Sequence, residues 1–211
     1  MPVINAYDKL VNELMHKGYL ISKPLIRAFK KIKRTDFVPR EVRSFAVKNV
    51  ALPIGYGQTI SQPLTVSFML ELLALAPGQR VLDVGSGSGW TTALLATMVG
   101  GKGQVYAVER IPELVETSKK NIAPYRFSNV MIVQGDGSKG LPEYQPFDRI
   151  LVSAAAHNVP PLLVKQLKPS GRMVIPSSHD DIRLIEKRSD ETIVQRIFPG
   201  FVFVPLIENT Q

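Results

Sequence analysis

Apolar residues recur at two different spacings along the chain, and the change of spacing separates a helical beginning from an alternating remainder. Leu10 and Leu14, and later Leu25 and Phe29, keep the spacing of one helical face. We therefore predict a helical N-terminal extension over residues 1–50.

The next segment, residues 51–63, follows neither the helical nor the strand period. Its prolines and glycines favour an irregular loop. Val66, Met69 and Leu73 then return to helical spacing, which predicts a helix over residues 66–75.

From residue 80 onward, short apolar stretches alternate with helical ones. The expected strands are residues 81–84, 104–109, 130–133, 148–152 and 172–175, and the expected helices are residues 91–98, 112–122 and 160–167. This alternation is typical of right-handed βαβ units around a mostly parallel sheet, whose ligands bind at the carboxyl ends of the strands. Residues 183–187 and 192–197, joined by a short polar link, predict an antiparallel C-terminal hairpin that makes the sheet mixed.

Composition narrows the class of protein. The 211 residues, 45% of them hydrophobic, suit a single α/β domain with an apolar core. No apolar run reaches the roughly 18 residues of a membrane span, and cysteine is absent, which excludes disulfides and thiolate metal sites. The first residues also lack the order of a signal peptide. We expect a cytoplasmic protein with no membrane partner and no metal. The net charge of +8 favours anionic partners, either nucleic acid or an acidic polypeptide.

The strongest local motif is Asp83-Val-Gly85-Ser-Gly87-Ser-Gly89, between a predicted strand and a predicted helix. Glycines let the backbone approach a ligand closely, and the first N–H groups of the helix point into the site. Trp90 occupies the last glycine position of the dinucleotide fingerprint and no Walker lysine follows, so a pyrophosphate site is disfavoured. An amino-acid ligand with a positively charged sulfur fits instead, because Asp83 adds negative charge beside the loop.

Acidic residues stand at the ends of the next two predicted strands. Glu109 can accept both hydroxyls of a ribose. Asp136, between Gly135 and Gly137, can accept a hydrogen bond from an adenine amine. Each feature alone has an ordinary alternative, such as a plain turn or a surface acid. In this order along the chain they predict a cofactor that contains adenosine.

The chain resembles the protein-L-isoaspartate (D-aspartate) O-methyltransferase family from about residue 10 to residue 206. The most specific segment is ALPIGYGQTISQP at 51–63, preceded by Arg34-x-Asp36-Phe37-Val38-Pro39. The motif VLDVGSGSGW at 81–90 is shared more widely among methyltransferases. Further matches are VERIPEL at 108–114, GDGS at 135–138, FDRILVSAAA at 147–156 and FVPL at 203–206. The chain departs from the family pattern at Leu64-Thr65, and Ser153 stands where the family has threonine.

The resemblance implies a Rossmann-like class I methyltransferase fold with S-adenosylmethionine as cofactor. It implies methyl transfer to the free α-carboxylate of L-isoaspartyl or D-aspartyl residues in damaged peptides and proteins. The ester then closes to a succinimide, which can reopen to normal aspartate.

With this resemblance we assign residues 51–65 to a substrate loop, 80–180 to the cofactor-binding core and 181–211 to a C-terminal hairpin and tail. The candidate cofactor contacts are Asp83, Gly85, Ser86, Gly87, Ser88, Gly89, Glu109, Arg110, Asp136 and Gly137. Ser61 in the T-I-S motif is the candidate catalytic residue. The candidate substrate contacts are Gln58, Thr59, Ile60, Gln62, Val204 and Pro205.

The implied reaction needs no general base, because an acceptor carboxylate with a pKa of roughly 3.5–4 is ionised at neutral pH. Accordingly, His16, His157 and His179 lie outside both the 51–63 segment and the glycine turn. We hypothesise that the Ser61 hydroxyl donates a hydrogen bond that orients the acceptor.

Two alternatives stay open. An RNA adenine methyltransferase would suit the basic charge, but a nucleic-acid partner is not expected, because only 8% of residues are aromatic and no basic stacking platform is evident. A protein that binds the cofactor without turnover has the departure at Leu64-Thr65 as its only support. We expect a monomer.

Overall fold

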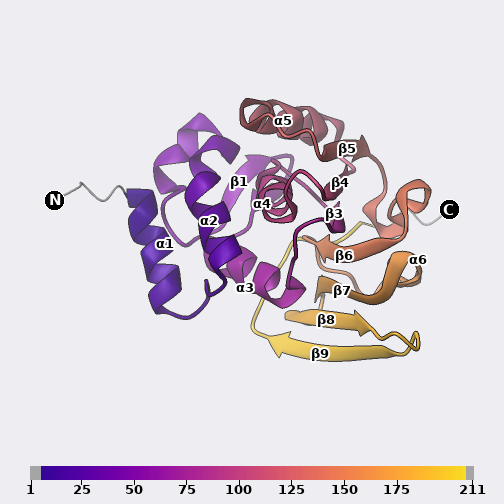
Figure 1. Cartoon of the computed structure of the whole chain (residues 1–211). Coiled ribbons are helices and arrows are strands. Elements are labelled where there is room, and N and C mark those ends of the chain that lie inside the picture. Colours follow the sequence, from indigo (N-terminus) through magenta and orange to yellow (C-terminus); the bar gives the residue numbers. More distant parts are fainter. Residues whose placement is uncertain (1–5, 208–211) are drawn as a thin grey trace.

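The computed structural model describes residues 6–207, in which strands and helices alternate around one large sheet (Figure 1). The α-helices are α1 (Ala6–His16), α2 (Lys23–Lys31), α3 (Pro63–Leu73), α4 (Trp90–Val99), α5 (Pro112–Ile122) and α6 (Pro161–Gln166). The strands are β1 (Leu52–Gly55), β2 (Gln58–Ile60), β3 (Arg80–Val84), β4 (Gln104–Glu109), β5 (Val130–Gln134), β6 (Phe147–Val152), β7 (Leu167–Ser177), β8 (Asp181–Lys187) and β9 (Ile193–Pro199). The short 3-10 helices are η1 (Arg34–Phe37), η2 (Arg40–Phe45), η3 (Ala123–Tyr125), η4 (Gly137–Lys139) and η5 (Pro142–Tyr144).

The large sheet has the strand order β5-β4-β3-β6-β7-β8-β9. Strands β3 to β7 pair in parallel, whereas β8 runs antiparallel to both of its neighbours. The predicted mixed sheet, with a reversed strand near one edge, is therefore confirmed. After β5 the chain returns to the other side of β3 to form β6, so the strand order reverses between β3 and β6.

Both faces of this sheet are covered, and neighbouring residues of a strand serve opposite faces. Val81 and Leu151 pack with α3, α4 and the N-terminal helices, while Leu82 and Ile150 pack with α6 and η5 on the other face. Strands buried on both sides read as continuous apolar runs, which explains why the strands were predictable from the sequence.

The N-terminal extension begins with the two predicted helices. Leu25 and Phe29 are fully buried on the inner face of α2. The backbone N–H groups of Ile21 and Ser22, just before α2, both donate to the Glu71 carboxylate of α3 at 2.7 Å. This contact fixes the extension to the helical layer over the sheet. Between α2 and residue 50 the chain forms only the short 3-10 helices η1 and η2 instead of the predicted α-helix.

The prediction of an irregular loop over residues 51–63 is wrong for most of its length. β1 and β2 form an antiparallel hairpin, in which Gly55 pairs with Gln58. Tyr56 and Gly57 both have positive φ, 55° and 70°, as a two-residue type I′ turn requires. The pattern concealed these strands because each is only three or four residues long. Helix α3 also begins earlier than predicted, at Pro63, because Pro suits the first helical turn.

The C-terminal hairpin predicted at 183–187 and 192–197 is confirmed as β8 and β9. β7 is longer than predicted and pairs with β8 over six residue pairs, from Arg172 to Ser177. Within residues 6–207 no helix is long and apolar enough to cross a membrane.

Candidate active site

A well-formed cavity opens at the carboxyl ends of β3, β4 and β6. In open α/β sheets, ligands bind where the strand order reverses, and this cavity lies at that reversal. It encloses about 870 Å³ of space, including the part open to solvent. Its walls are Ile54, Gln58, Thr59, Ile60, Ser61, Val66, Val84, Gly85, Ser86, Gly87, Ser88, Trp90, Thr91, Val108, Glu109, Arg110, Ile111, Gly137, Ser153, Ala154, Val204, Pro205, Leu206 and Ile207.

The glycine loop forms the floor of this cavity. Gly85, Gly87 and Gly89 all have positive φ, of 78°, 53° and 94°. Residues other than glycine rarely adopt this backbone conformation. The N–H of Gly85 donates to the Val108 carbonyl at 2.8 Å, which joins the loop to β4. The backbone therefore takes the course that the sequence motif predicts.

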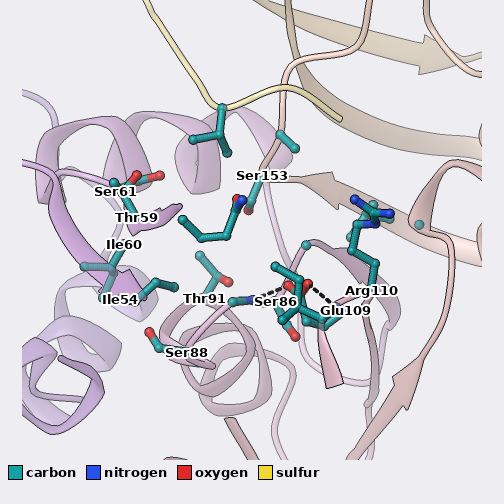
Figure 2. A pocket seen from close by; sticks show the side chains of 18 of the residues that line it. Ile54, Thr59, Ile60, Ser61, Ser86, Ser88, Thr91, Glu109, Arg110 and Ser153 are labelled. Carbon is teal, nitrogen blue, oxygen red and sulfur yellow. Dashed lines mark hydrogen bonds between the residues drawn. The ribbon is translucent and has the colours of Figure 1, made fainter. Parts of the chain in front are cut away.

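Glu109 fixes the loop from the side. Its carboxylate accepts the backbone N–H of Gly87 at 2.9 Å and that of Ile111 at 3.0 Å (Figure 2). Glu109 is 6% exposed and lines the cavity. Since a carboxylate has about four lone-pair positions, its oxygens keep acceptor capacity for a ligand.

Asp83 lies fully buried beneath the loop. Its Oδ2 accepts the hydroxyls of Thr92 at 2.6 Å and Thr91 at 3.1 Å, but its Oδ1 has no hydrogen-bond partner. Burial raises the pKa of Asp83 to about 6, and the negative charge of nearby Glu109 adds to the rise. A positively charged ligand above the loop would favour the ionised form of this carboxyl group.

Most predicted cofactor contacts line the cavity, but three do not. Asp83 lies beneath its floor, and Gly89 packs against Ser118 and Ile122 of α5. Asp136 caps η4, where its Oδ1 accepts the Ser138 N–H at 3.0 Å and hydroxyl at 2.6 Å. Its predicted adenine contact has no support in the cavity lining, although the following residue, Gly137, does line the cavity.

A second cavity adjoins the first between the start of α3 and the chain after β9. Its walls are Ala51, Thr59, Ser61, Gln62, Thr65, Ser153, Gly200, Phe201, Val202, Phe203 and Val204. Gln62, a predicted substrate contact, lines only this second cavity. The residues Thr59, Ser61, Ser153 and Val204 line both cavities, and we call these four residues the shared wall.

Three of the four side chains of the shared wall carry hydroxyls. Figure 2 shows Thr59 and Ser61 across the cavity from Glu109 and Arg110, with Ser153 between them. No residue that lines the second cavity in the described part of the chain is charged. Ser153 was missed as a site residue; the sequence held a signal for it, because it directly follows β6 within the segment 147–156.

Two residues that lie near the site in the sequence, His157 and Trp90, have structural roles. His157 is exposed, its Nδ1 lies 3.2 Å from the Ser178 hydroxyl, and it lines neither cavity. Trp90 is 1% exposed and packs edge-on against Phe29, yet it also forms part of the first cavity's wall. Across residues 6–207 no group of three or more His, Asp or Glu side chains is placed to hold a metal ion.

The first cavity suits a cationic nucleoside that carries an amino acid. Ser86 Oγ at its floor, and Asp83 Oδ1 beneath the floor, are buried without hydrogen-bond partners. Buried polar atoms of this kind call for a ligand or water. Glu109 offers the ribose acceptor at the end of the second parallel strand. The fold and the site together define a Rossmann-like, class I methyltransferase that uses S-adenosylmethionine.

Comparison with known proteins gives the family. The family model described as protein-L-isoaspartate(D-aspartate) O-methyltransferase matches residues 5–211. A protein-L-isoaspartate O-methyltransferase from Aeropyrum pernix is 46% identical over 210 residues, which cover 98% of this chain and 81% of that protein. The chain therefore belongs to the protein-L-isoaspartate O-methyltransferase family, as the sequence motifs predicted.

Solved structures agree with this placement. A protein-L-isoaspartate O-methyltransferase superposes with a TM-score of 0.88 at 30% identity, covering 96% of this chain and 66% of that chain. A Plasmodium falciparum protein assigned to the same activity, solved in complex with S-adenosyl-L-homocysteine, superposes with a TM-score of 0.86 at 26% identity. That match covers 97% of this chain and all of the other.

Proposed function

We propose that this protein transfers the methyl group of S-adenosylmethionine to the free α-carboxylate of L-isoaspartyl or D-aspartyl residues in damaged proteins. The observation that carries the proposal is the shared wall, where a cavity suited to the cofactor meets a second cavity open to a peptide. Methylation of this carboxylate turns it into an ester, which closes to a succinimide and so initiates repair.

Several residues of the first cavity would hold the cofactor. Glu109 would accept the ribose hydroxyls, the loop from Gly85 to Ser88 would bind the amino-acid end, and Gly137 would lie against the adenine. Arg110 and Asp136 are proposed to lie at the adenosine end, and Asp83 and Gly89 to support the loop from below. When bound, S-adenosylmethionine supplies an electrophilic methyl group on a sulfonium.

The protein's own part in the reaction is to hold an acceptor that is already ionised. The hydroxyls of Ser61, Thr59 and Ser153 are the available donors at the shared wall, and none of them is engaged by another described residue. A hydroxyl orients a carboxylate without neutralising it, whereas a lysine or arginine there would lower its nucleophilicity and repel the sulfonium. Positioning of this kind supplies roughly 7–11 kcal/mol.

The second cavity is proposed to take the peptide backbone on both sides of the damaged residue. Gln58, Ile60 and Gln62 would contact the peptide from one side, and Val204 and Pro205 from the other. The chain departs from the family pattern at Leu64 and Thr65. Thr65 lines this cavity and Leu64 does not. The departure therefore lies at the peptide end of the site rather than at the cofactor end.

A methylation assay with labelled S-adenosylmethionine tests the proposal. The two substrates are peptides of one sequence that contain either isoaspartate or aspartate at a single position, and bulk RNA is the third. Transfer to the isoaspartyl peptide alone supports the proposal. Transfer to RNA alone would establish the nucleic-acid alternative, and cofactor binding without transfer to any substrate would establish a non-catalytic protein.

Four further points stay predictions. They are a monomeric state, a cytoplasmic location, the division of one domain at residues 50, 65 and 180, and the lack of a nucleic-acid partner. Light scattering after size-exclusion chromatography tests the first, cell fractionation the second, limited proteolysis the third, and an RNA-binding measurement the fourth.

A further inference from the structure

Arg34 is a charged side chain that the structure buries completely behind Ser61. It begins η1 and is 0% exposed. Burial lowers its pKa to about 10, so the guanidinium stays positively charged at neutral pH. Among the described residues no carboxylate forms an ion pair with it. A buried charge without an ionic partner is costly, so its other contacts must stabilise it.

Backbone carbonyls take the place of that partner. One terminal nitrogen, Nη1, donates to Ala46 at 3.4 Å and to Lys48 at 3.3 Å. The other, Nη2, donates to the carbonyls of Val50 at 2.7 Å, Ile60 at 3.3 Å and Ser61 at 3.1 Å. One side chain thereby holds the segment that leads into β1 and the segment that leaves β2.

The last two of these contacts fall on the peptide units beside the candidate catalytic hydroxyl. Ser61 lies between the end of β2 and the start of α3. From its other side, the Asn49 side-chain oxygen accepts the N–H of Leu64 at 2.9 Å and so holds the first turn of α3. The direction in which the Ser61 hydroxyl points depends on this backbone.

The guanidinium also contacts the cofactor side of the site. It lies over the ring of Trp90, with its central carbon 5.5 Å from the ring centroid. Trp90 begins α4 directly after the glycine loop and lines the first cavity. Arg34 therefore connects the backbone of Ser61 to the helix that carries the glycine loop.

We propose that Arg34 is a positioning residue for methyl transfer, which fixes the Ser61 hydroxyl relative to the bound cofactor. This inference rests on the proposed function of the site. A lysine at the same position would keep the charge but present its donors from a single nitrogen, which cannot span carbonyls from Ala46 to Ser61. The planar guanidinium of arginine, with two terminal nitrogens, can donate to all five carbonyls at once.

The test measures kcat and KM for the isoaspartyl peptide, together with the affinity for S-adenosylhomocysteine by calorimetry. The variants are Arg34→Lys, Ser61→Ala and the double variant. Small misplacements of reacting groups cost up to about 100-fold, so we expect Arg34→Lys to lower kcat by about 10- to 100-fold. Its S-adenosylhomocysteine affinity should stay near that of the wild type.

The double variant separates positioning from a general structural effect. If Arg34 acts through Ser61, then in the Ser61→Ala background Arg34→Lys should change kcat by no more than about twofold, the scatter of independent effects. Equal fractional losses in both backgrounds would overturn the proposal, as would wild-type kcat in Arg34→Lys.

Arg149→Lys is the matched control, because the acceptors of Arg149 within residues 6–207 are likewise backbone carbonyls, those of Leu73, Ala74 and Asp148. Arg149 lies near the amino end of β6, whereas the site is at the carboxyl end. Arg149→Lys should therefore leave kcat unchanged.

The fluorescence of Trp90, the only tryptophan in the chain, reports whether each variant is folded. If Arg34→Lys and Arg34→Gln both lose cofactor binding and the emission of a buried tryptophan, Arg34 serves folding alone and the proposal is overturned. Absence of transfer by the wild type would instead overturn the proposed function.

Discussion

The carboxylate of Glu109 accepts the backbone N–H of Gly87 at 2.9 Å and thereby joins the end of β4 to the middle of the glycine loop. The other oxygen of Glu109 accepts the N–H of Ile111 at 3.0 Å, at the start of the segment leading into α5. One side chain thus shapes the cavity floor and also faces the cavity. A substitution of Glu109 should therefore affect both the predicted contact with ribose and the shape of the glycine loop.

We predict that Glu109→Gln weakens binding of S-adenosylhomocysteine. Glutamine has only one side-chain oxygen to accept hydrogen bonds, so either Gly87 or Ile111 loses its acceptor. Hydrogen bonds to charged groups contribute about 1.5–3 kcal/mol, which corresponds to a loss of about 10- to 100-fold in affinity. Isothermal calorimetry measures this change directly.

The matched control for that experiment is Glu113→Gln. Glu113 is exposed in the first turn of α5 and does not line the cavity. The affinity of Glu113→Gln for S-adenosylhomocysteine should equal that of the wild type. Wild-type affinity in Glu109→Gln itself would contradict the assignment of Glu109 to the cofactor site.

Gly87→Val is predicted to abolish detectable cofactor binding. Gly87 has a φ of 53°, and a Cβ built on it lies 3.1 Å from Ile54 Cδ1. A β-branched residue is strongly disfavoured at such φ, and its side chain would also enter the cavity. Gly101→Val is the control, because Gly101 has no positive φ and open space around it. Calorimetry that found equal affinities for the two variants would remove the glycine loop from the cofactor site.

The cofactor side of the site was largely predictable because its determinants are local. Gly85 and Gly87 directly follow β3, whose residues Val81, Leu82 and Val84 are apolar, and Glu109 ends the neighbouring strand β4. The strand order alone therefore brings them together. Asp136 also follows its strand as expected, and its side chain caps η4. Its contact with adenine stays a prediction.

The acceptor side was less predictable because it depends on contacts between distant segments. Ser153 reaches the shared wall only because β6 inserts beside β3. The carbonyls that surround Arg34 come from residues 46–61, and no periodicity marks them. The family resemblance pointed to Ser61, but the buried cation behind it needed the three-dimensional structure.

Ser153→Ala is predicted to lower turnover of the isoaspartyl peptide while cofactor affinity stays near the wild-type value. Loss of one hydroxyl donor to a carboxylate costs about 1.5–3 kcal/mol, or about 10- to 100-fold in kcat/KM. Ser153→Thr keeps the hydroxyl and should retain most of the activity. Steady-state kinetics of both variants check this, and an active Ser153→Ala would exclude the residue from substrate binding.

Ser61→Ala is predicted to have a similar effect on turnover, for the same physical reason, and to leave S-adenosylhomocysteine affinity nearly intact. Ser67→Ala is a suitable control, because Ser67 is buried in α3 with its hydroxyl donating to Leu64 and lines neither cavity. Unchanged kcat in Ser61→Ala, measured with the same peptide, would remove Ser61 from the mechanism.

The last prediction concerns Asp83 and the dependence of folding stability on pH. Burial raises the pKa of Asp83 from 3.8 to about 6 in the folded protein, so between these values the folded state binds more protons at this site than the unfolded state. Its contribution to stability is therefore fully present below pH 3.8 and is lost as the pH rises through about 6. The full change is at most about 3 kcal/mol.

Asp83→Asn should remove this component, since an amide does not ionise. The difference in unfolding free energy between the wild type and Asp83→Asn should therefore shift against the wild type as the pH rises from 4 to 7, by up to about 3 kcal/mol. Urea titrations across that range measure it. Asp180→Asn is the control, because Asp180 is exposed and its positive φ of 57° suits asparagine equally well; it should keep the wild-type pH profile. Parallel profiles for the wild type and Asp83→Asn would mean that the pKa of this carboxyl group is the same in the folded and the unfolded protein, which would contradict the prediction.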